Sequence, residues 1–461
     1  MTLIKSISGF RGTIGGLRGE NLTPPDIVSF TIAFYRFLAA SHGDTRIKVV
    51  TGRDARISGP MVQGLVNQTL IALGADVVDL GLSTTPTVEI AVPAEQAHGG
   101  IILTASHNPA QWNALKLLNA KGEFISAADG AEVLRLVSRE EEAEFADVMK
   151  LGTLTVKDYM QEHIQQILAL PLVDRDLIAS ANLKVVVDGV NSSGGIFVPA
   201  LLEALGVYNV TCIHCEPHGH FAHNPEPLEE HLQDLSSSVV AQGAHLGITV
   251  DPDVDRLAFV CENGTMFGEE YTLVAVADYV LSRTPGNTVS NLSSTRALRD
   301  VTVKHGMSYK AAAVGEVNVV ECMKSTGAVI GGEGNGGIIY PELHYGRDAL
   351  VGIALFLSHY AEKKMTMTAL RKSYPSYTMS KRKIELEKGM DVDAILAKVE
   401  LVFRNEEINT VDGLKIDFAD GWVHLRKSNT EPIIRIYSEG ASAEVAERLS
   451  DIVMREIQQS L

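Results

Sequence analysis

Short runs of β-branched residues alternate with longer amphipathic segments through the first three quarters of the chain. One such unit has a strand pattern at 46–52, followed by a helical pattern and a second strand pattern within 59–82. The same order recurs within 183–206 and again within 287–327. Apolar runs such as that at 184–188 are typical of strands buried on both faces, in mainly parallel sheets covered by helices. The pattern therefore predicts three α/β domains.

From about residue 373 the pattern changes to strands that alternate between apolar and polar residues, combined with two helical patterns. This change predicts a smaller α+β domain at the end of the chain. Polar or proline-containing segments mark the expected joints between domains. The predicted fold class is α/β with four domains, with boundaries at 1–152, 153–256, 257–372 and 373–461.

Composition narrows the class of protein further. The 461 residues are 45% hydrophobic and 21% charged, which excludes a disordered chain, a collagen and a coiled coil. The formal charge of −17 disfavours binding to nucleic acid, because phosphate backbones are repelled. No apolar run is long enough for a membrane span or a signal peptide, and four cysteines are too few for a disulfide framework. We expect a cytoplasmic protein with reduced thiols and no membrane partner.

Three aspartates follow a strand pattern in the segment DPDVDR. In extended chain the side chains of Asp251, Asp253 and Asp255 project to the same side, so their carboxylates converge. Convergent carboxylates repel one another unless a hard cation neutralises them, and oxygen ligands favour Mg²⁺. Arg256 adds a guanidinium that can contact a phosphate oxygen. The alternative is a solvated acidic turn.

Ser106 follows a strand pattern in the segment TASHNP, where Asn108 and Pro109 prevent an immediate helix. The pattern predicts an exposed loop serine, which is either a nucleophile or phosphate carrier or an ordinary turn serine. The segment lacks the G-x-S-x-G motif of hydrolases, and His107 would point away from Ser106 in extended backbone. A serine-hydrolase triad is therefore disfavoured.

Two further loops contain residues suited to binding a sugar phosphate. GGEGNGG at 331–337 offers the carboxylate of Glu333 and the amide of Asn335 among glycines, and these groups suit sugar hydroxyls. The segment also fits G-x-G-x-x-G, but Pro341 follows instead of a helix, which disfavours a dinucleotide site. The second loop has the donors of a phosphate cradle: Arg426, Lys427, Ser428, Asn429 and Thr430. A plain flexible turn and a hairpin turn are the alternatives.

Other candidate groups are weaker. Arg11, Arg53 and Arg56 lie among glycines and offer cations. Cys212 and Cys215 form a C-x-x-C with four histidines close in sequence, at 214, 218, 220 and 223. A zinc or redox site is disfavoured there because no second C-x-x-C exists and the histidine spacing is irregular.

The motifs TASHNP, DPDVDR, GEGNGG and RKSNTEP occur in this order, with FRGT near the start. Together they resemble the α-D-phosphohexomutase superfamily over essentially the whole chain. The resemblance implies four domains around a central cleft, three of them α/β and the fourth of a different type. It also implies an isomerase that depends on Mg²⁺ and moves a phosphoryl group between O6 and O1 of a hexose.

The resemblance assigns a role to each matching residue. Ser106 matches the phosphoserine, and the metal would lie against its phosphate, held by the three aspartates of DPDVDR. Glu333 and Asn335 match sugar-binding positions, and Arg11 matches an arginine near the phosphoserine. Lys116 matches a lysine proposed to act in general acid/base catalysis. The loop that holds the non-reacting phosphate is matched by Arg426, Ser428, Asn429 and Thr430.

The chain departs from the family pattern at three places. Pro252 and Val254 stand where many members have glycines, which leaves the metal ligands intact. Gly337 stands where many bacterial members have a histidine, so that general base cannot be carried over; His107, Lys116 or His344 are the substitutes. SNTEP mixes the SGTEP of phosphoglucosamine mutases with the SNTTP of phosphomannomutases.

The resemblance implies a phosphohexomutase that acts through a hexose 1,6-bisphosphate, which serves as both intermediate and activator. The expected partner is a phosphorylated hexose or hexosamine, with glucosamine 6-phosphate favoured and a phosphomannomutase/phosphoglucomutase as the alternative. A phosphoserine-dependent sugar phosphatase and a non-catalytic sugar-phosphate sensor are further alternatives. The patterns are compatible with a monomer or a homodimer.

Overall fold

The computed structural model describes residues 2–6, 9–43, 45–139, 143–386, 390–427 and 433–460. The chain forms two compact units, each made of two segments. The first contains Met1–Thr272 and Gly336–Thr368, and the second contains Leu273–Asn335 and Ala369–Leu461. None of the described helices combines the length and the apolar character that crossing a membrane requires.

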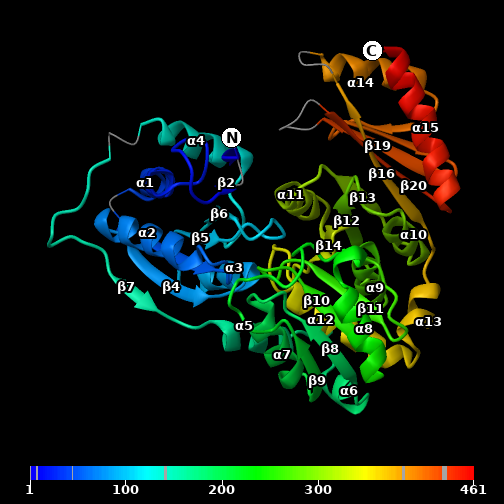
Figure 1. The fold of residues 1–461 in the computed structure, drawn as a ribbon, viewed down its shortest axis with the longest axis horizontal. Coiled ribbons are helices and arrows are strands. Elements are labelled where there is room, and N and C mark those ends of the chain that lie inside the picture. The colour runs from blue at the N-terminus through cyan, green and yellow to red at the C-terminus, as the bar shows by residue number, and fades with distance from the viewer. Residues whose placement is uncertain are drawn as a thin grey trace. The chain divides into compact units, whose positions relative to one another are not determined.

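The first unit begins with a seven-stranded mixed sheet in the order β1-β2-β6-β5-β3-β4-β7 (Figure 1). Strands β3, β4, β5 and β7 run parallel, whereas β1, β2 and β6 add antiparallel pairs. The strands are β1 Ile4–Ser6, β2 Gly9–Thr13, β3 Lys48–Arg53, β4 Asp76–Leu82, β5 Gly99–Leu103, β6 Trp112–Asn119 and β7 Leu154–Val156. The helices are α1 Pro24–His42, α2 Gly59–Ala72, α3 Thr85–Ala94 and α4 Ala127–Val137.

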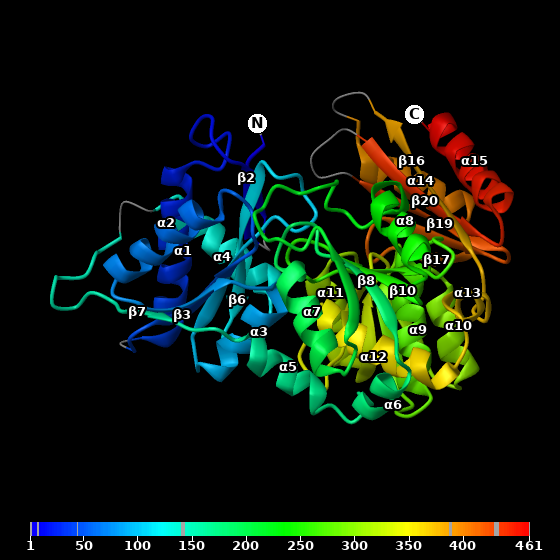
Figure 2. The same ribbon diagram turned by 60° about the horizontal axis from the view of Figure 1, so that its bottom comes forward.

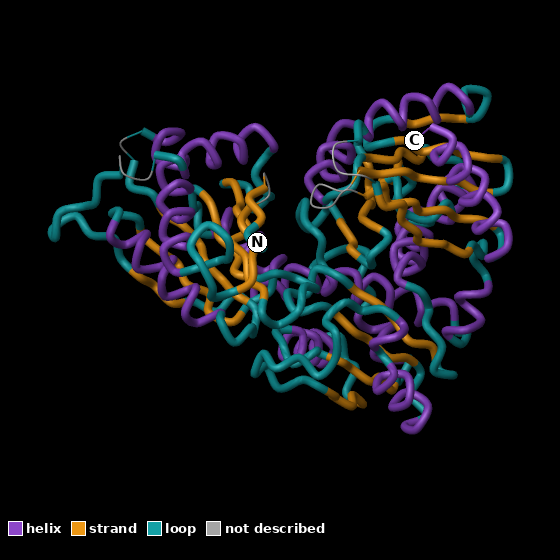
Figure 3. Tube along the Cα trace, turned by 45° about the horizontal axis from the view of Figure 1, so that its top comes forward, coloured by secondary structure: helices purple, strands orange, loops and turns teal. Residues whose placement is uncertain are grey.

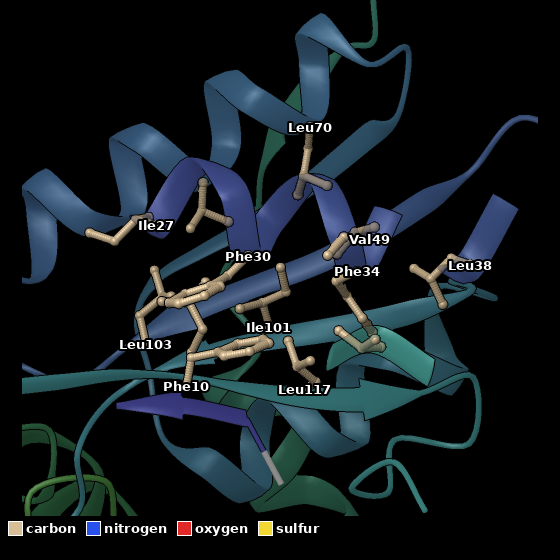
Figure 4. Packing of buried hydrophobic residues seen from close by; sticks show 14 of the residues in the cluster. Phe10, Ile27, Phe30, Phe34, Leu38, Val49, Leu70, Ile101, Leu103 and Leu117 are labelled. Atoms are coloured by element: carbon tan, nitrogen blue, oxygen red, sulfur yellow. The ribbon is translucent and has the colours of Figure 1, made fainter. Parts of the chain in front are cut away.

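Helices cover both faces of this sheet, as the buried strand patterns predict. Side chains of α1, α2 and α4 pack on one face around a cluster that includes Phe10, Phe30 and Ile101 (Figure 4). Side chains of α3 pack on the other face against Val50 and Ile102. Helix α1 begins at a capping box in which Thr23 and Asp26 satisfy each other's backbone N–H groups.

A second sheet in the same unit has the order β11-β10-β8-β9 and is parallel except for the β10/β11 hairpin (Figure 2). Its strands are β8 Lys184–Asp188, β9 Asn209–Ile213, β10 Leu246–Val250 and β11 Leu257–Cys261. The helical elements are α5 Met160–Leu168, α6 Arg175–Ser180, α7 Gly194–Ala204, η2 Glu229–His231 and α8 Gln233–Gln242. The unit's later segment adds β15 Gly337–Ile339 and α12 Ala349–Lys363.

The second unit contains a parallel arrangement of β13, β12 and β14 and a C-terminal antiparallel sheet in the order β16-β20-β19-β18-β17. In Figure 3 the strands of the C-terminal sheet are drawn in orange beside the label C. Its first part has β12 Asn287–Asn291, β13 Tyr309–Ala312, β14 Ala328–Glu333, α10 Ala297–Lys304 and α11 Glu316–Thr326. Its last part has β16 Thr378–Glu385, β17 Glu407–Asn409, β18 Leu414–Phe418, β19 Gly421–Lys427, β20 Ile433–Gly440, α14 Val392–Val402 and α15 Ala443–Ser460. Helices α9 Glu269–Leu281 and α13 Met367–Lys372 each cross from one unit into the other.

The fold class follows the expectation of three α/β domains and an α+β domain. Two strands lie just outside the sequence-based boundaries. β7 follows the boundary at 152 and pairs with β4, and β11 follows the boundary at 256 and pairs with β10. Both strands are short and lie at the edge of their sheets, so sequence periodicity alone does not show to which sheet they belong.

We expect Phe30→Ala to lower the free energy of unfolding of the first domain by about 3–5 kcal/mol. The Phe30 ring is 1% exposed and stacks on the Phe10 ring with centroids 3.9 Å apart. Urea unfolding followed by Trp112 fluorescence, in a Trp422→Phe background, measures this domain alone. Phe145→Ala is the control, because that ring is 54% exposed and its loss should change stability by less than about 0.5 kcal/mol.

Candidate active site

Three buried carboxylates occupy the turn between β10 and β11. Asp251, Asp253 and Asp255 are each at most 1% exposed, and one ligand oxygen from each lies within 4.8 Å of the others. Backbone N–H groups of Asp255 and Arg256 donate to Asp251 Oδ1, which closes the turn. The turn also places Val254 in the left-handed region at φ 63°. The carboxylates converge as expected, but they do so in a turn and not in the extended chain on which the prediction was based.

Each aspartate has a different set of partners. Lys116 Nζ from β6 lies 2.7 Å from Asp253 Oδ2 and 3.6 Å from Asp255 Oδ2. Arg347 Nη2 donates to Asp255 Oδ2 at 2.6 Å, and the Thr85 hydroxyl donates to Asp253 Oδ2 at the same distance. Cations and a hydroxyl thus compensate the buried negative charge from several elements.

The oxygens that remain fit a metal ion. Within the described residues, the buried atoms Asp253 Oδ1 and Asp255 Oδ1 have no hydrogen-bond donor. A buried carboxylate oxygen without a donor is costly, and a hard cation supplies the missing positive charge. The donor set is oxygen only, which suits Mg²⁺ better than zinc. The three aspartates therefore fit the metal that the sequence predicts.

Ser106 lies in the loop after β5 and reaches this triad directly. Its hydroxyl donates to Asp251 Oδ2 at 2.6 Å, and its backbone is left-handed at φ 49°. The residue is 7% exposed, so the expectation of an exposed serine is wrong. The loop packs against the β10/β11 turn, and a pattern of turn-forming residues carries no information about that contact.

The strained serine backbone is held by a network of buried hydrogen bonds. Ser106 N–H donates to the Thr104 hydroxyl at 3.0 Å, and that hydroxyl donates to Asp54 Oδ2 at 2.6 Å. Arg56 Nε donates to the same Asp54 oxygen at 2.9 Å. A left-handed conformation costs a non-glycine residue about 1–2 kcal/mol, which this network offsets.

Arg56 fixes the course of the serine loop. It is fully buried, and its remaining N–H groups donate to four backbone carbonyls, those of Ser106, Asn108, Pro109 and Trp112. Sequence reasoning offers Arg56 as a cation for a ligand. The structure shows instead that its donors serve the protein's own loop.

Burial and neighbouring charges shift the titration of these groups in different directions. Burial raises the pKa of Asp251, and the charges of Asp255 and Asp253 raise it further. Burial lowers the pKa of Lys116, but the carboxylates of Asp253 and Asp255 outweigh it and the net shift is upward. Lys116 thus lies in the structure as a charge partner of Asp253 and Asp255.

His107 lies close enough to the triad to be affected by its charges. Burial lowers the pKa of His107 to about 3, and the charge of Arg256 acts in the same direction. Its Nδ1 is buried and has no hydrogen-bond partner among the described residues. His344, the other histidine considered as a base, has Nδ1 3.3 Å from Glu89 Oε2 and Nε2 3.3 Å from Asp348 Oδ2. Only its Nε2 makes a hydrogen bond, to Asp348; its Nδ1, like that of His107, has no hydrogen-bond partner among the described residues.

The remaining predicted residues occupy other places in the fold. Arg11 is exposed on β2, in register with Ala114 of β6, two residues before Lys116. Arg256 Nη1 lies 3.4 Å from Glu226 Oε1, and Arg256 Nε lies 4.0 Å from Asp251 Oδ2.

The two loops predicted to bind sugar and phosphate contribute residues to the second unit. Glu333 is 5% exposed and accepts from Asn291 Nδ2 at 2.8 Å and from Gly315 N at 3.0 Å. Asn335 is half-buried, and Arg426 at the end of β19 pairs with Asp412 at 2.9 Å. Ser428, Asn429 and Thr430 lie outside the described residues.

One glycine of GGEGNGG is required by the protein's own packing. Gly336 has φ 81°, and a Cβ there would lie 2.0 Å from the carbonyl oxygen of Leu257. The glycine therefore lets this loop approach β11.

Two participants were missed by sequence reasoning. Arg347 is 92 positions from Asp255 in the chain, and Thr85 is 168 positions from Asp253. Arg347 directly precedes Asp348, whose side chain caps α12. The capping residue Asp348 marks the start of a helix in the sequence. Nothing in the local sequence pattern indicates that the preceding Arg347 contacts the aspartates.

Family models match the chain from one end to nearly the other. They are described as phosphoglucomutase/phosphomannomutase alpha/beta/alpha domain I at 5–144, domain II at 158–264, domain III at 268–377 and the C-terminal domain at 381–456. The chain therefore belongs to the phosphoglucomutase/phosphomannomutase family. It is an enzyme, an isomerase of the phosphohexomutase class, and the resemblance noted in its motifs is confirmed.

Relatives and a solved structure agree with this assignment. A phosphoglucomutase/phosphomannomutase of Thermococcus kodakarensis is 35% identical, covering 98% of both chains. A probable phosphoglucosamine mutase of Methanopyrus kandleri is 32% identical, covering 96% of this chain and 95% of its own. The crystal structure of a family protein from Burkholderia thailandensis is 26% identical with a TM-score of 0.84, covering 99% of this chain and 97% of its own.

We expect Thr104→Val to destabilise the protein by about 1–3 kcal/mol and to lower kcat. The change is nearly isosteric, but it leaves Ser106 N–H and one oxygen of Asp54 without their shared partner. Thermal unfolding and turnover measure the two effects.

Thr249→Val is the matched control. Thr249 lies on β10 and is 1% exposed, and its hydroxyl has no partner among the described residues. Its replacement should leave stability unchanged or increase it. Equal losses in the two variants would contradict the role of the Thr104 hydroxyl.

Proposed function

We propose that the protein interconverts hexose 6-phosphate and hexose 1-phosphate through a phosphoserine at Ser106 and a hexose 1,6-bisphosphate intermediate. The observation that supports this most is the 2.6 Å hydrogen bond from the Ser106 hydroxyl to Asp251, one of three buried carboxylates. It brings the group that would carry phosphate to the edge of a cation site. Phosphoryl transfer depends mainly on such positioning and on charge neutralisation.

Asp251, Asp253 and Asp255 would hold the metal ion, and their oxygen-only donor set suits Mg²⁺. When bound, Mg²⁺ supplies positive charge to the oxygens of the transferring phosphoryl group. Arg347 and Lys116 fix the orientation of Asp255 and Asp253 through the contacts described above. These two side chains keep the ligand oxygens in place before substrate arrives.

In the first half-reaction the bond between phosphorus and Ser106 Oγ breaks, and a bond forms from phosphorus to a hydroxyl oxygen of the sugar phosphate. The hydroxyl loses its proton, and Ser106 Oγ leaves as an alkoxide that takes up a proton. After the bisphosphate reorients, the second half-reaction returns the other phosphoryl group to Ser106. The sum is an isomerisation without net release of phosphate.

We assign acceptance of the sugar proton to His107. Its Nδ1 is unpartnered within the described residues, and its lowered pKa keeps the ring neutral at physiological pH. A weak base suffices because a loose transition state leaves most of the proton on the sugar oxygen until late. The raised pKa of Lys116 suits it to stabilise negative charge on the leaving serine oxygen.

The distal phosphate and the sugar would be held by the two loops at 331–337 and 426–430. Glu333 and Asn335 are proposed to contact sugar hydroxyls. The phosphate that does not react is assigned to Arg426, Ser428, Asn429 and Thr430. A separate phosphate-binding loop is needed because Ser106 must react at both O1 and O6 of the sugar. The phosphate at the end that is not reacting must therefore be bound in both orientations of the sugar.

Glucosamine 6-phosphate is our favoured substrate. The buried carboxylate of Glu333, oriented by Asn291 and Gly315, offers negative charge that suits a 2-ammonium group. The name of the Methanopyrus relative supports the same choice. Mannose and glucose phosphates form the second candidate, which the name of the Thermococcus relative favours.

We expect mutase turnover on glucosamine 6-phosphate, with Mg²⁺ and a trace of the matching hexose 1,6-bisphosphate, to be lost in Ser106→Ala. The variant lacks the only oxygen at this position that can accept the phosphoryl group. Initial rates on glucosamine 6-phosphate, mannose 1-phosphate and glucose 1-phosphate rank the substrates. Turnover retained in Ser106→Ala refutes the assignment, and stoichiometric release of free phosphate by the unaltered enzyme indicates a phosphatase.

Glu333→Gln tests the choice of substrate. Removing the negative charge should lower kcat/KM for glucosamine 6-phosphate by about 5- to 100-fold, equivalent to about 1–3 kcal/mol. The rate with glucose 1-phosphate is the internal control, because that sugar carries no charge at the 2-position. Equal losses on both substrates would show that Glu333 does not recognise the ammonium group.

A further inference from the structure

A second cluster of metal-ligating side chains lies at the carboxyl end of β8, outside the aspartate triad. Asp188 Oδ2 is 3.3 Å from His214 Nδ1 and 3.0 Å from His223 Nε2. Asp188 is fully buried and the two histidines are half-buried. One ligand atom from each residue lies within 4.8 Å of the other two.

The second nitrogen of each histidine faces an acceptor as well. His223 Nδ1 is 2.8 Å from the carbonyl oxygen of Asn224, and His214 Nε2 is 3.6 Å from Asp234 Oδ2. A neutral imidazole has only one N–H. The carbonyl of Asn224 can only accept, so Nδ1 of a neutral His223 carries the hydrogen and Nε2 presents its lone pair to Asp188. Positive charge is therefore needed between His223 and Asp188.

Two arrangements supply that charge. Either His223 takes up a second proton while a neutral His214 donates its Nδ1–H to Asp188, or one cation lies between the three ligand atoms. With a proton on His223 alone, the lone pair of His214 Nε2 faces a carboxylate oxygen of Asp234 at 3.6 Å, so two electron-rich atoms oppose each other. One divalent ion compensates the carboxylate and both lone pairs at once.

The spacing suits a tetrahedral ion. Bonds of about 2.0–2.1 Å to imidazole nitrogen and carboxylate oxygen place neighbouring ligands about 3.3 Å apart. The separations of 3.0 and 3.3 Å from Asp188 Oδ2 to the two imidazole nitrogens are close to this value, and the two nitrogens lie within 4.8 Å of each other. Metal-binding histidines commonly donate their other N–H to a carbonyl or a carboxylate, as His223 does to Asn224 here; Asp234 Oδ2 lies 3.6 Å from His214 Nε2.

We propose that Asp188, His214 and His223 bind a borderline transition-metal ion of the Zn²⁺ class at a site separate from the catalytic triad. Two imidazoles and one carboxylate favour such an ion over Mg²⁺. Cys212 and Cys215, which first suggest a metal in this segment, are not ligands. The site depends on histidines 9 positions apart and on an aspartate from another strand, so a C-x-x-C spacing does not reveal it.

The ion would brace the loop from 214 to 223 against β8. That loop contacts the network around the serine loop at two points. A Cβ at Gly219 would lie 1.9 Å from the carbonyl oxygen of Ala55, and the Phe221 ring lies 5.2 Å from the guanidinium carbon of Arg56. The proposed role is structural, because the bound ion would fix a loop that covers Arg56.

The test uses the full chain without an affinity tag, stripped of metal and kept in millimolar Mg²⁺ so that the triad is occupied. Zn²⁺ is titrated while bound zinc is measured by elemental analysis, and Co²⁺ is titrated while its visible ligand-field bands are recorded. We expect about one Zn²⁺ per chain, intense bands typical of tetrahedral cobalt, and a rise in melting temperature on adding Zn²⁺.

His223→Gln should weaken Zn²⁺ binding by at least about 100-fold and abolish both the cobalt bands and the thermal shift, because one of three ligands is lost. His220→Gln is the matched control, since this exposed histidine lies in the same loop outside the cluster. Zinc binding that is absent from the unaltered chain, or equal in the two variants, overturns the proposal.

Discussion

The burial of three carboxylates in one turn is the constraint that the rest of the first unit satisfies. Asp251, Asp253 and Asp255 come within ligand distance of one another in a place that water does not reach. Their repulsion is met by cations and hydroxyls from α3, β6 and the segment before α12, which are far apart in sequence. Burying this charge without compensation would be costly, which explains why three elements that are distant in sequence each place a polar or charged side chain against the turn.

The same constraint accounts for the strained backbone at the site. Ser106 and Val254 both have positive φ without being glycine, and Ser106 lies in direct contact with the turn that contains Val254. Such conformations persist only where the surroundings hold them. For Ser106 the holding groups are Thr104, Asp54 and Arg56; for Val254 they include full burial of its side chain. This arrangement holds the hydroxyl oxygen of Ser106 in a fixed position.

Sequence periodicity predicted the class of each domain, because the apolar period is set by local geometry that the structure retains. It also predicted that the three aspartates converge, but through an extended backbone, whereas the structure brings them together in a turn with Val254 at φ 63°. It did not predict Arg347 or Thr85, whose contacts with that turn depend on tertiary packing. Arg56 shows the same limit: its residue type was recognised as chemically important, but whether it serves a ligand or the protein's own carbonyls depends on burial.

The contacts of Lys116 and Arg347 have a consequence for how the protein is made. Their positive charges lie against Asp253 and Asp255 and compensate part of the buried negative charge. The chain therefore contains its own counter-ions, and it can reach its folded state before any divalent cation arrives. A zinc finger, by contrast, folds only with its metal. A shortage of the divalent cation would therefore lower the turnover rate of each enzyme molecule without lowering the amount of folded protein in the cell.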